Sequence, residues 1–336
     1  QGIALQDERQ DYGGRVNASF KLFDDWLEVR PAVDYRQAAR NNHYPNFQQA
    51  MRNNPTRSPY DPDSETGYNV WINESLDYNV VADAMLEDYY GLDKWFKPEV
   101  NLKLNIKPIP GLNYQQVVGY ENHQWELHQY WPSTHRSEID NSRKGHAHLA
   151  FSKTENLTSE GYFSYVKDFK GGHNLNATAG YSYFEVNGEN FGMDNYNFSV
   201  DGIKYWDIGQ GSYLTDGKAG MSSGKSVTER LFSFFARANY SYQDKYMLSA
   251  SIRHEGSSKF AADNRWANFW SATAGWRISN EEFMKDFDWL DDLKIRFGYG
   301  VTGNNDFSAT YMANMLGSDT NWMICLLYTS PSPRDM

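Results

Sequence analysis

The chain has 336 residues, with 32 Lys and Arg against 43 Asp and Glu, and a formal net charge of −11. An acidic chain without a block of basic residues is not expected to bind nucleic acid. The apolar fraction of 40% excludes a disordered chain, and the lack of any apolar run of about 18 residues excludes a transmembrane helix. Aromatic residues make up 16% of the sequence, which together with 26 Gly favours a β-rich fold.

Six segments up to residue 184 alternate between apolar and polar residues, the pattern of a strand whose two faces meet different surroundings. They are 15–22, 27–36, 99–107, 112–121, 157–166 and 174–184. In 99–107, for example, Val100 and Leu102 alternate with Asn101 and Lys103. In 112–121 the polar Gln116 interrupts the apolar face.

The remaining alternating segments are 232–242, 246–255, 266–278 and 293–302. The sequence therefore predicts ten strands. Most of them are about 9–11 residues long, the length that a tilted strand needs to cross a bilayer.

Short and long connections alternate between these segments. Tight turns are expected at 23–26, 108–111, 168–173 and 243–245, whereas 37–98, 122–156 and 185–230 form long connections. Residues 256–265 form a shorter connection, and Ser279 is expected to cap a short helical turn within 279–292. Short turns at one end and long loops at the other are typical of an outer-membrane barrel.

Alternation alone also suits a soluble β-sandwich, such as a carbohydrate-binding module, whose apolar faces pack against each other. Three features favour a transmembrane antiparallel β-barrel, the first of which is that the strands are long and regular. Aromatic residues lie at segment ends, for example Trp26, Trp125 and Trp276, as an interfacial belt requires. Arg and Lys recur on the polar faces, which the interior of a sandwich would not supply. We therefore predict an all-β membrane protein and keep the sandwich as the alternative.

The last twelve residues, Cys325 to Met336, contain the only cysteine and resemble the in-frame translation of a sequencing adapter. We interpret 325–336 as an artefact and 1–324 as a partial barrel domain. A genuine Pro- and Ser-rich tail is the alternative. The first residues, Gln1 to Ala4, do not have the pattern of a signal peptide, so we expect a processed chain or a fragment.

The stretch 230–304 resembles the SusC/RagA family of TonB-dependent outer-membrane transporters. The run from Arg230 to Leu248, RLFSFFARANYSYQDKYML, matches a motif of that family. The run from Arg253 to Phe260, RHEGSSKF, matches a second one, with Glu255 in place of the more usual Asp. The segments 271–278, 293–296 and 299–304 follow the same pattern, and the spacing of these pieces is similar too.

The resemblance implies that the chain is part of a plugged barrel of about 22 strands in the bacterial outer membrane. It also implies import of oligosaccharides or peptides, powered by the TonB complex, together with a SusD-like surface lipoprotein that acts as a lid. We expect the plug and the TonB contact to lie outside this chain. The host organism and the transported substrate remain open.

Two groups of residues are candidates for function. The polar faces of successive strands carry Arg237, Arg253, Arg277, Lys294 and Arg296, either to grip the plug and guide a polar substrate or simply as solvated wall residues. The long connections carry Trp71, Trp131 and Trp206, whose rings suit sugar stacking, contact with a lid, or packing of the loops themselves.

We expect no enzyme and no cofactor, because no nucleophile–base set, phosphate-binding loop or dinucleotide fingerprint occurs. His146 and His148 have strand spacing and share a face, but two His without a third ligand make a weak metal site. The acidic turn from Asp61 to Glu65 lacks the spacing of an EF-hand calcium loop.

Overall fold

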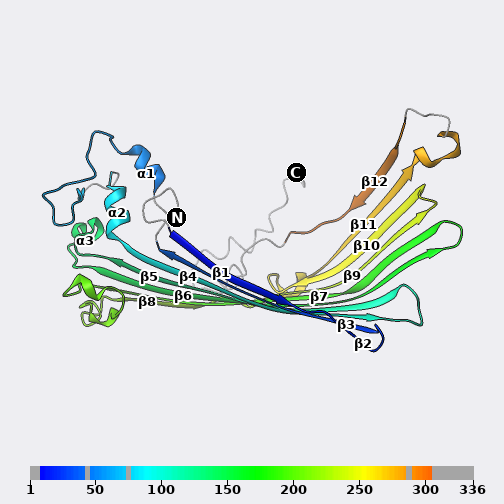
Figure 1. The fold of residues 1–336 in the computed structure, drawn as a ribbon, viewed down its shortest axis with the longest axis horizontal. Coiled ribbons are helices and arrows are strands. Elements are labelled where there is room, and N and C mark those ends of the chain that lie inside the picture. Colours follow the sequence, from blue (N-terminus) through cyan, green and yellow to red (C-terminus); the bar gives the residue numbers. More distant parts are fainter. Residues whose placement is uncertain (1–7, 42–45, 73–76, 285–289, 305–336) are drawn as a thin grey trace.

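A computed structural model describes residues 8–41, 46–72, 77–284 and 290–304. In these ranges the chain forms one twelve-stranded sheet that curves into an open trough (Figure 1). The strands are β1 (Glu8–Asn17), β2 (Phe20–Leu22), β3 (Leu27–Asn41), β4 (Asp88–Asn105), β5 (Leu112–Trp131), β6 (His146–Phe169), β7 (His173–Tyr196), β8 (Gly220–Lys225), β9 (Glu229–Tyr242), β10 (Tyr246–Ser257), β11 (Trp266–Arg277) and β12 (Lys294–Gly300).

The helices are short and lie in the connections. They are α1 (Phe47–Arg52), α2 (Val80–Leu86), α3 (Arg136–Asp140) and the 3₁₀ turns η1 (Asp201–Ile203), η2 (Ile208–Gln210), η3 (Ala262–Asn264), η4 (Ile278–Asn280) and η5 (Glu282–Met284). The last two confirm a helical turn within 279–292, but Ser279 does not cap it: Ser279 lies inside η4, and its hydroxyl donates to Asp292. None of the helices in the described ranges has the length and apolarity that crossing a membrane requires.

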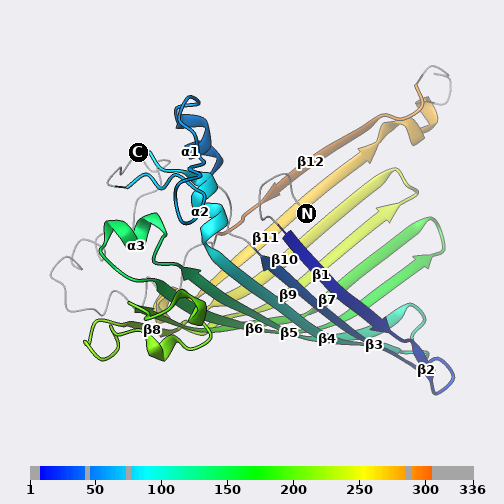
Figure 2. The same cartoon turned by 60° about the vertical axis from the view of Figure 1, so that its left-hand side comes forward.

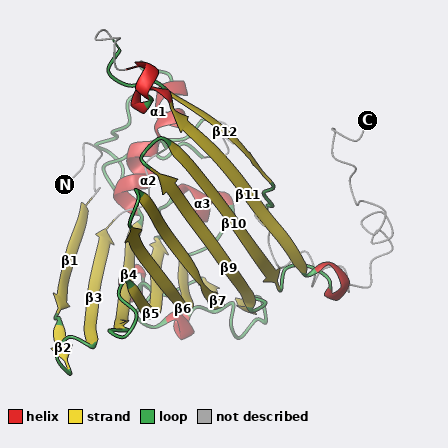
Figure 3. Cartoon of the chain, turned by 90° about the vertical axis from the view of Figure 1, so that its right-hand side faces the viewer, coloured by secondary structure: helices red, strands yellow, loops and turns green. Residues whose placement is uncertain are grey.

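The sheet is an antiparallel meander in which nearly every strand pairs with its neighbour in the sequence. Its order is β1-β3-β4-β5-β6-β7-β9-β10-β11-β12, with β2 paired to β3 and β8 to β7. β1 and β12 form the two edges (Figure 3). A β-sandwich needs two sheets packed face to face. The single sheet therefore shows that the soluble-sandwich alternative is wrong.

All the predicted tight turns lie at one end of the sheet, and α1, α2 and α3 lie at the other (Figures 1 and 2). Positive φ angles at Phe23, Asp24, Gln243 and Asp244 let these turns reverse the chain within a few residues. At Gly111 φ is +92°, and an added Cβ would lie 2.0 Å from the carbonyl oxygen of Val166, so only glycine fits this turn.

The connections at the opposite end are shorter than predicted, because four strands continue far into them. β4, β5, β6 and β7 contain 18, 20, 24 and 24 residues. A strand needs only about 9–11 residues to cross the hydrocarbon core. Beyond the membrane both faces of a strand meet water, so polar residues occupy both and the two-residue period disappears. Residues 122–131 and 146–156 of the predicted loop 122–156 are therefore strand, as are 185–196 and 229–230 of the predicted loop 185–230, and β8 was missed entirely.

The pairing register separates two faces. Val100 pairs with Val118, and Leu104 with Tyr114, on the apolar face, whereas Asn101 pairs with Val117 and Lys103 with Gln115 on the polar face. Only an apolar face is stable against lipid, so we assign it to the bilayer and the polar face to the lumen. Trp125 lies opposite Asp93 within β5 and therefore on the lumen face, so its predicted place in an interfacial belt was wrong.

Ion pairs mark where the lipid-facing band ends. On the outer face of the long strands, Lys94 contacts Glu126 at 2.8 Å and Lys153 contacts Glu189 at 2.9 Å. On the outer face Lys94 follows Phe96 on β4, and Glu155 and then Lys153 follow Leu157 on β6. The parts of β4 to β7 beyond them stand outside the membrane.

Gln116, the polar residue that interrupts the apolar face, forms hydrogen bonds with its neighbours on the lipid face. Its Oε1 accepts hydrogen bonds from the hydroxyls of Tyr114 (2.7 Å) and Tyr181 (3.0 Å), and its Nε2 donates to Ser159 Oγ at 3.1 Å. Gly161 leaves the space for this cluster, because a Cβ there would lie 2.5 Å from the Tyr114 hydroxyl. A polar side chain is thus accommodated where lipid offers no hydrogen bonds.

Candidate functional site

A stack of rings lines the lumen face where β5, β6 and β7 leave the membrane. The ring of His146 lies between Trp131 (centroids 4.5 Å apart) and Tyr196 (4.2 Å), nearly parallel to both. The guanidinium of Arg143 also lies over the ring of Tyr196, 4.4 Å from its centroid. The register places these rings on adjacent strands, since His146 pairs with both Trp131 and Tyr196.

A carboxylate ties the stack to a second imidazole. Asp194 Oδ1 lies 2.7 Å from His146 Nε2 and 2.9 Å from His148 Nδ1. Burial lowers the pKa of His146, although Asp194 acts in the opposite direction. The two His do share a face, as their spacing predicts. No arrangement of three His, Cys, Asp or Glu side chains within the described ranges could hold a metal ion.

A second stack lies on the lumen face of β3, β4 and β5. The rings of Trp95 and His123 are parallel with centroids 4.8 Å apart, and the guanidinium of Arg36 lies 5.1 Å from the Trp95 centroid. His123 Nε2 is 3.0 Å from Asp93 Oδ1. Trp95 is therefore covered by a protein group on each side. In the first stack no second ring contacts Trp131 in the described part of the chain, so Trp131 is the aromatic residue best placed to receive a ligand ring.

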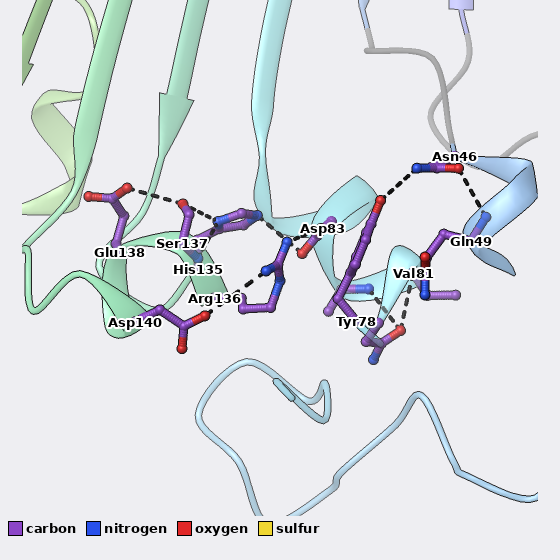
Figure 4. Close-up of polar contacts among 12 residues, drawn as sticks. Asn46, Gln49, Tyr78, Val81, Asp83, His135, Arg136, Ser137, Glu138 and Asp140 are labelled. Carbon is purple, nitrogen blue, oxygen red and sulfur yellow. Dashed lines mark hydrogen bonds and ion pairs between the residues drawn. The ribbon is translucent and has the colours of Figure 1, made fainter. Parts of the chain in front are cut away.

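The loops above the lumen are joined by a cluster of polar contacts (Figure 4). Asp83 of α2 lies 3.3 Å from His135 Nε2 and 3.5 Å from the guanidinium of Arg136, the residues that begin α3. Arg136 covers the ring of Tyr78 at 4.4 Å. Next to it, the fully buried Glu138 pairs with Arg143 at 2.7 Å. These contacts hold the 46–86 loop against the 132–145 loop.

The structure buries Trp71 within its own loop. The side chain is 4% exposed, and the guanidinium of Arg57 lies 4.1 Å from its ring centroid. In this conformation Trp71 packs the loop and offers no open ring face to a sugar.

Trp206 is 76% exposed, but it lies on the outer side of the wall. The loop that carries it packs on the outer face of β5 and β6 through a core of Tyr130, Ala147, Phe198 and Tyr205. Asp201 fixes this loop by accepting hydrogen bonds from the Tyr130 hydroxyl (2.7 Å) and from Ser133 N (2.9 Å) and Oγ (2.7 Å). Trp206 is thus separated from the lumen by the sheet.

The five predicted wall cations all lie on the polar face of β9 to β12, as their register shows. Arg253 contacts Glu255 at 2.6 Å, and Arg277 contacts Asp292 at 3.3 Å. Arg237, Lys294 and Arg296 line a common cavity of about 340 Å³.

Sequence reasoning missed Tyr196 and Asp194, the two residues that contact His146 from β7. Tyr196 and Asp194 fell in a predicted loop, so no register could be assigned to them. Their spacing of two was the available signal, since it matches that of His146 and His148.

We compared the chain with known proteins. It is 30% identical over 221 residues to the TonB-dependent receptor P39 of Formosa agariphila, which covers 63% of this chain and 20% of that protein. It is 41% identical over 91 residues to the TonB-dependent receptor SusC of Bacteroides thetaiotaomicron, which covers 27% of this chain and 9% of SusC. No protein-family model matches the sequence.

Among solved structures, the RagAB peptide transporter matches with a TM-score of 0.74 and 20% identity, over 90% of this chain and 34% of that one. The same importer in its open-open state gives a TM-score of 0.73 over 90% and 33%. The chain thus spans about a fifth of the length of P39 and a third of the RagAB chain.

The curved sheet with its apolar outer band is a segment of an outer-membrane β-barrel. The relatives that the chain resembles are TonB-dependent receptors, among them SusC, so the similarity to SusC/RagA-like proteins that the motifs in 230–304 predict is confirmed.

Proposed function

We propose that the protein to which this chain belongs is a TonB-dependent importer that takes up oligosaccharides or peptides together with a SusD-like surface lipoprotein. The similarity to SusC, 41% identity over 91 residues, carries this proposal. The fold match to the RagAB peptide transporter supports it, because it extends over 90% of the chain. The relatives are receptors and transporters, and we propose passage through the barrel without covalent chemistry.

The ring stack at the extracellular mouth supplies a contact for such a substrate. A sugar ring or a peptide side chain entering from outside would meet Trp131 on the lumen face, next to the carboxylate of Asp194. Aromatic faces bind the apolar C–H surface of a sugar, and carboxylates accept hydrogen bonds from hydroxyl or amide groups.

Deletion of the complete gene in the source strain tests the proposal. The deletion strain should lose growth on particular oligosaccharides or peptides as sole carbon source, and a plasmid copy should restore it. Inactivation of TonB should have the same effect, and a surface lipoprotein should co-purify with the tagged transporter. Unchanged uptake after loss of either the gene or TonB would refute the proposal.

A further inference from the structure

The lumen wall of β9 to β12 contains cations without carboxylate partners. Arg237, Lys294 and Arg296 line the cavity of about 340 Å³, and no Asp or Glu is among its described lining residues. Lys294 Nζ lies 2.7 Å from the sulfur of Met247, a weak acceptor. Within the described ranges no ion pair involves any of the three cations. Among its described lining residues the cavity therefore carries a net positive charge.

Small side chains between the cations create the hollow. Ser249 pairs with Thr273, and Met247 with Gly275, on the lumen face of β10 and β11. Gly275 in turn pairs with Arg296 of β12. Ser249, Thr273 and Gly275 are small, and the longer side chains of Met247, Lys294 and Arg296 line the cavity with them.

The opposite part of the wall is different, because its charges neutralise each other. Arg36 contacts Asp11 at 2.8 Å, Arg30 contacts Glu28 at 2.7 Å, and Lys97 contacts Glu121 at 3.1 Å. The excess of positive charge on β9 to β12 is thus a local feature. It contrasts with the net charge of −11 of the whole chain.

The donor set of the cavity suits an oxyanion. Guanidinium and ammonium groups make charge-assisted hydrogen bonds to carboxylate and sulfate oxygens, and a guanidinium presents a planar pair of donors. The Thr273 hydroxyl and the side-chain NH₂ of Asn239 add neutral donors around the same space, while the Ser249 hydroxyl donates to Asn239 Oδ1. A neutral ligand would leave the three cations without counter-charge.

We propose that this cavity binds the carboxylate or sulfate groups of the imported molecule, so that the transporter prefers acidic oligomers. This inference rests on the proposed function, since it assumes that a substrate passes along this wall. The cavity lies near the tight-turn end of the lumen, because Met247 and Lys294 lie at the ends of their strands next to the turns. An acidic substrate would reach it after passing the ring stack at the mouth.

The complete transporter, purified in detergent, provides the first test. Equilibrium dialysis with radiolabelled sulfate should show saturable binding. The triple variant R237Q/K294Q/R296Q should bind sulfate at least tenfold more weakly. K103Q is the matched control, because Lys103 is a cation on the lumen face of β4 outside the cavity, and it should bind like the wild type. Absence of saturable binding, or equal binding by the triple variant, would overturn the proposal.

A competition experiment tests whether an acidic oligomer binds at the same place as sulfate. Tetragalacturonate should displace the labelled sulfate, whereas its methyl ester, which lacks the negative charges, should not. Equal displacement by both, or by neither, would overturn the assignment to acidic substrates. If the triple variant does not give the heat-modifiable gel band of a folded barrel, K294Q and R296Q are tested singly. If the triple variant loses sulfate binding but supports TonB-dependent growth as well as the wild type does, the cavity is not used in transport. That result would refute this inference and leave the proposed function standing.

Discussion

Replacement of Gly180 by alanine tests the close contact of β6 and β7 in the barrel wall. A Cβ at this position would lie 2.2 Å from the carbonyl oxygen of Gly161 and 2.5 Å from Cβ of Tyr162. Non-bonded carbon atoms normally stay about 3.5–4.0 Å apart. The obstructing oxygen belongs to the backbone, so no side-chain rotation relieves the overlap and the two strands must move apart.

The expected cost follows from this overlap. Overpacking of a well-packed site costs about 1–3 kcal/mol, and a rigid backbone obstacle places Gly180→Ala at the upper end. Alanine also restricts the unfolded chain more than glycine does, and this stabilises the folded state by up to about 1 kcal/mol. We therefore expect a net loss of about 2 kcal/mol in the free energy of unfolding.

Gly14→Ala provides the matched control. No heavy atom lies within 4 Å of a Cβ at Gly14, and its φ angle is not positive. This variant should gain about 0.4–1 kcal/mol from the unfolded chain alone. Urea titration of the complete transporter in detergent, followed by tryptophan fluorescence, should thus shift the two midpoints in opposite directions. Equal midpoints, or a higher midpoint for Gly180→Ala, would refute the reasoning.

Three further predictions concern single polar groups. The pKa of Glu281 is lowered from 4.5 to about 2 by hydrogen bonds from the Tyr246 hydroxyl, the Trp276 indole and Lys245. The contribution of Glu281 to the stability of the folded state should therefore be present above pH 4.5 and lost as the pH falls towards 2. Acid unfolding of Glu281→Gln should lack this component, and an unchanged pH profile would contradict the prediction. Gln116→Leu should lower the stability of the barrel in detergent by about 1–3 kcal/mol, because two tyrosine hydroxyls lose their acceptor, and a urea midpoint at or above the wild-type value would disprove this. Asp201→Ala should expose the loop around Trp206 to proteolysis while the barrel stays folded, and equal cleavage rates in variant and wild type would show that Asp201 does not fix it.

The membrane-spanning part of the fold could be predicted because lipid imposes a strict rule on it. Each residue there faces either hydrocarbon or the lumen, so Val100 and Asn101 differ in polarity and the period of two is visible. The tight turns were recognisable because some of their positions accept only glycine, as at Gly111, where φ is positive and a Cβ would clash with the backbone.

The parts outside the membrane escaped prediction because water surrounds both faces of the strands. His146 and Tyr196 lie on paired strands, yet nothing in the local sequence distinguishes a strand in water from a loop. The three tryptophans show the same limit. The sequence placed them all in outer connections, but only tertiary packing decides that Trp71 is buried, Trp131 faces the lumen and Trp206 faces outwards.

The unequal strand lengths make the rim of the described sheet higher on one side than on the other. β6 and β7 have 24 residues each, whereas β9 has 14 and β10 has 12. At about 3.3 Å per residue the difference of 10 to 12 residues corresponds to about 33–40 Å of strand. On the side of β4 to β7 the wall therefore extends further beyond the membrane than on the side of β9 and β10. We therefore expect a ligand to enter over the shorter strands, because the longer strands block its approach from the other side.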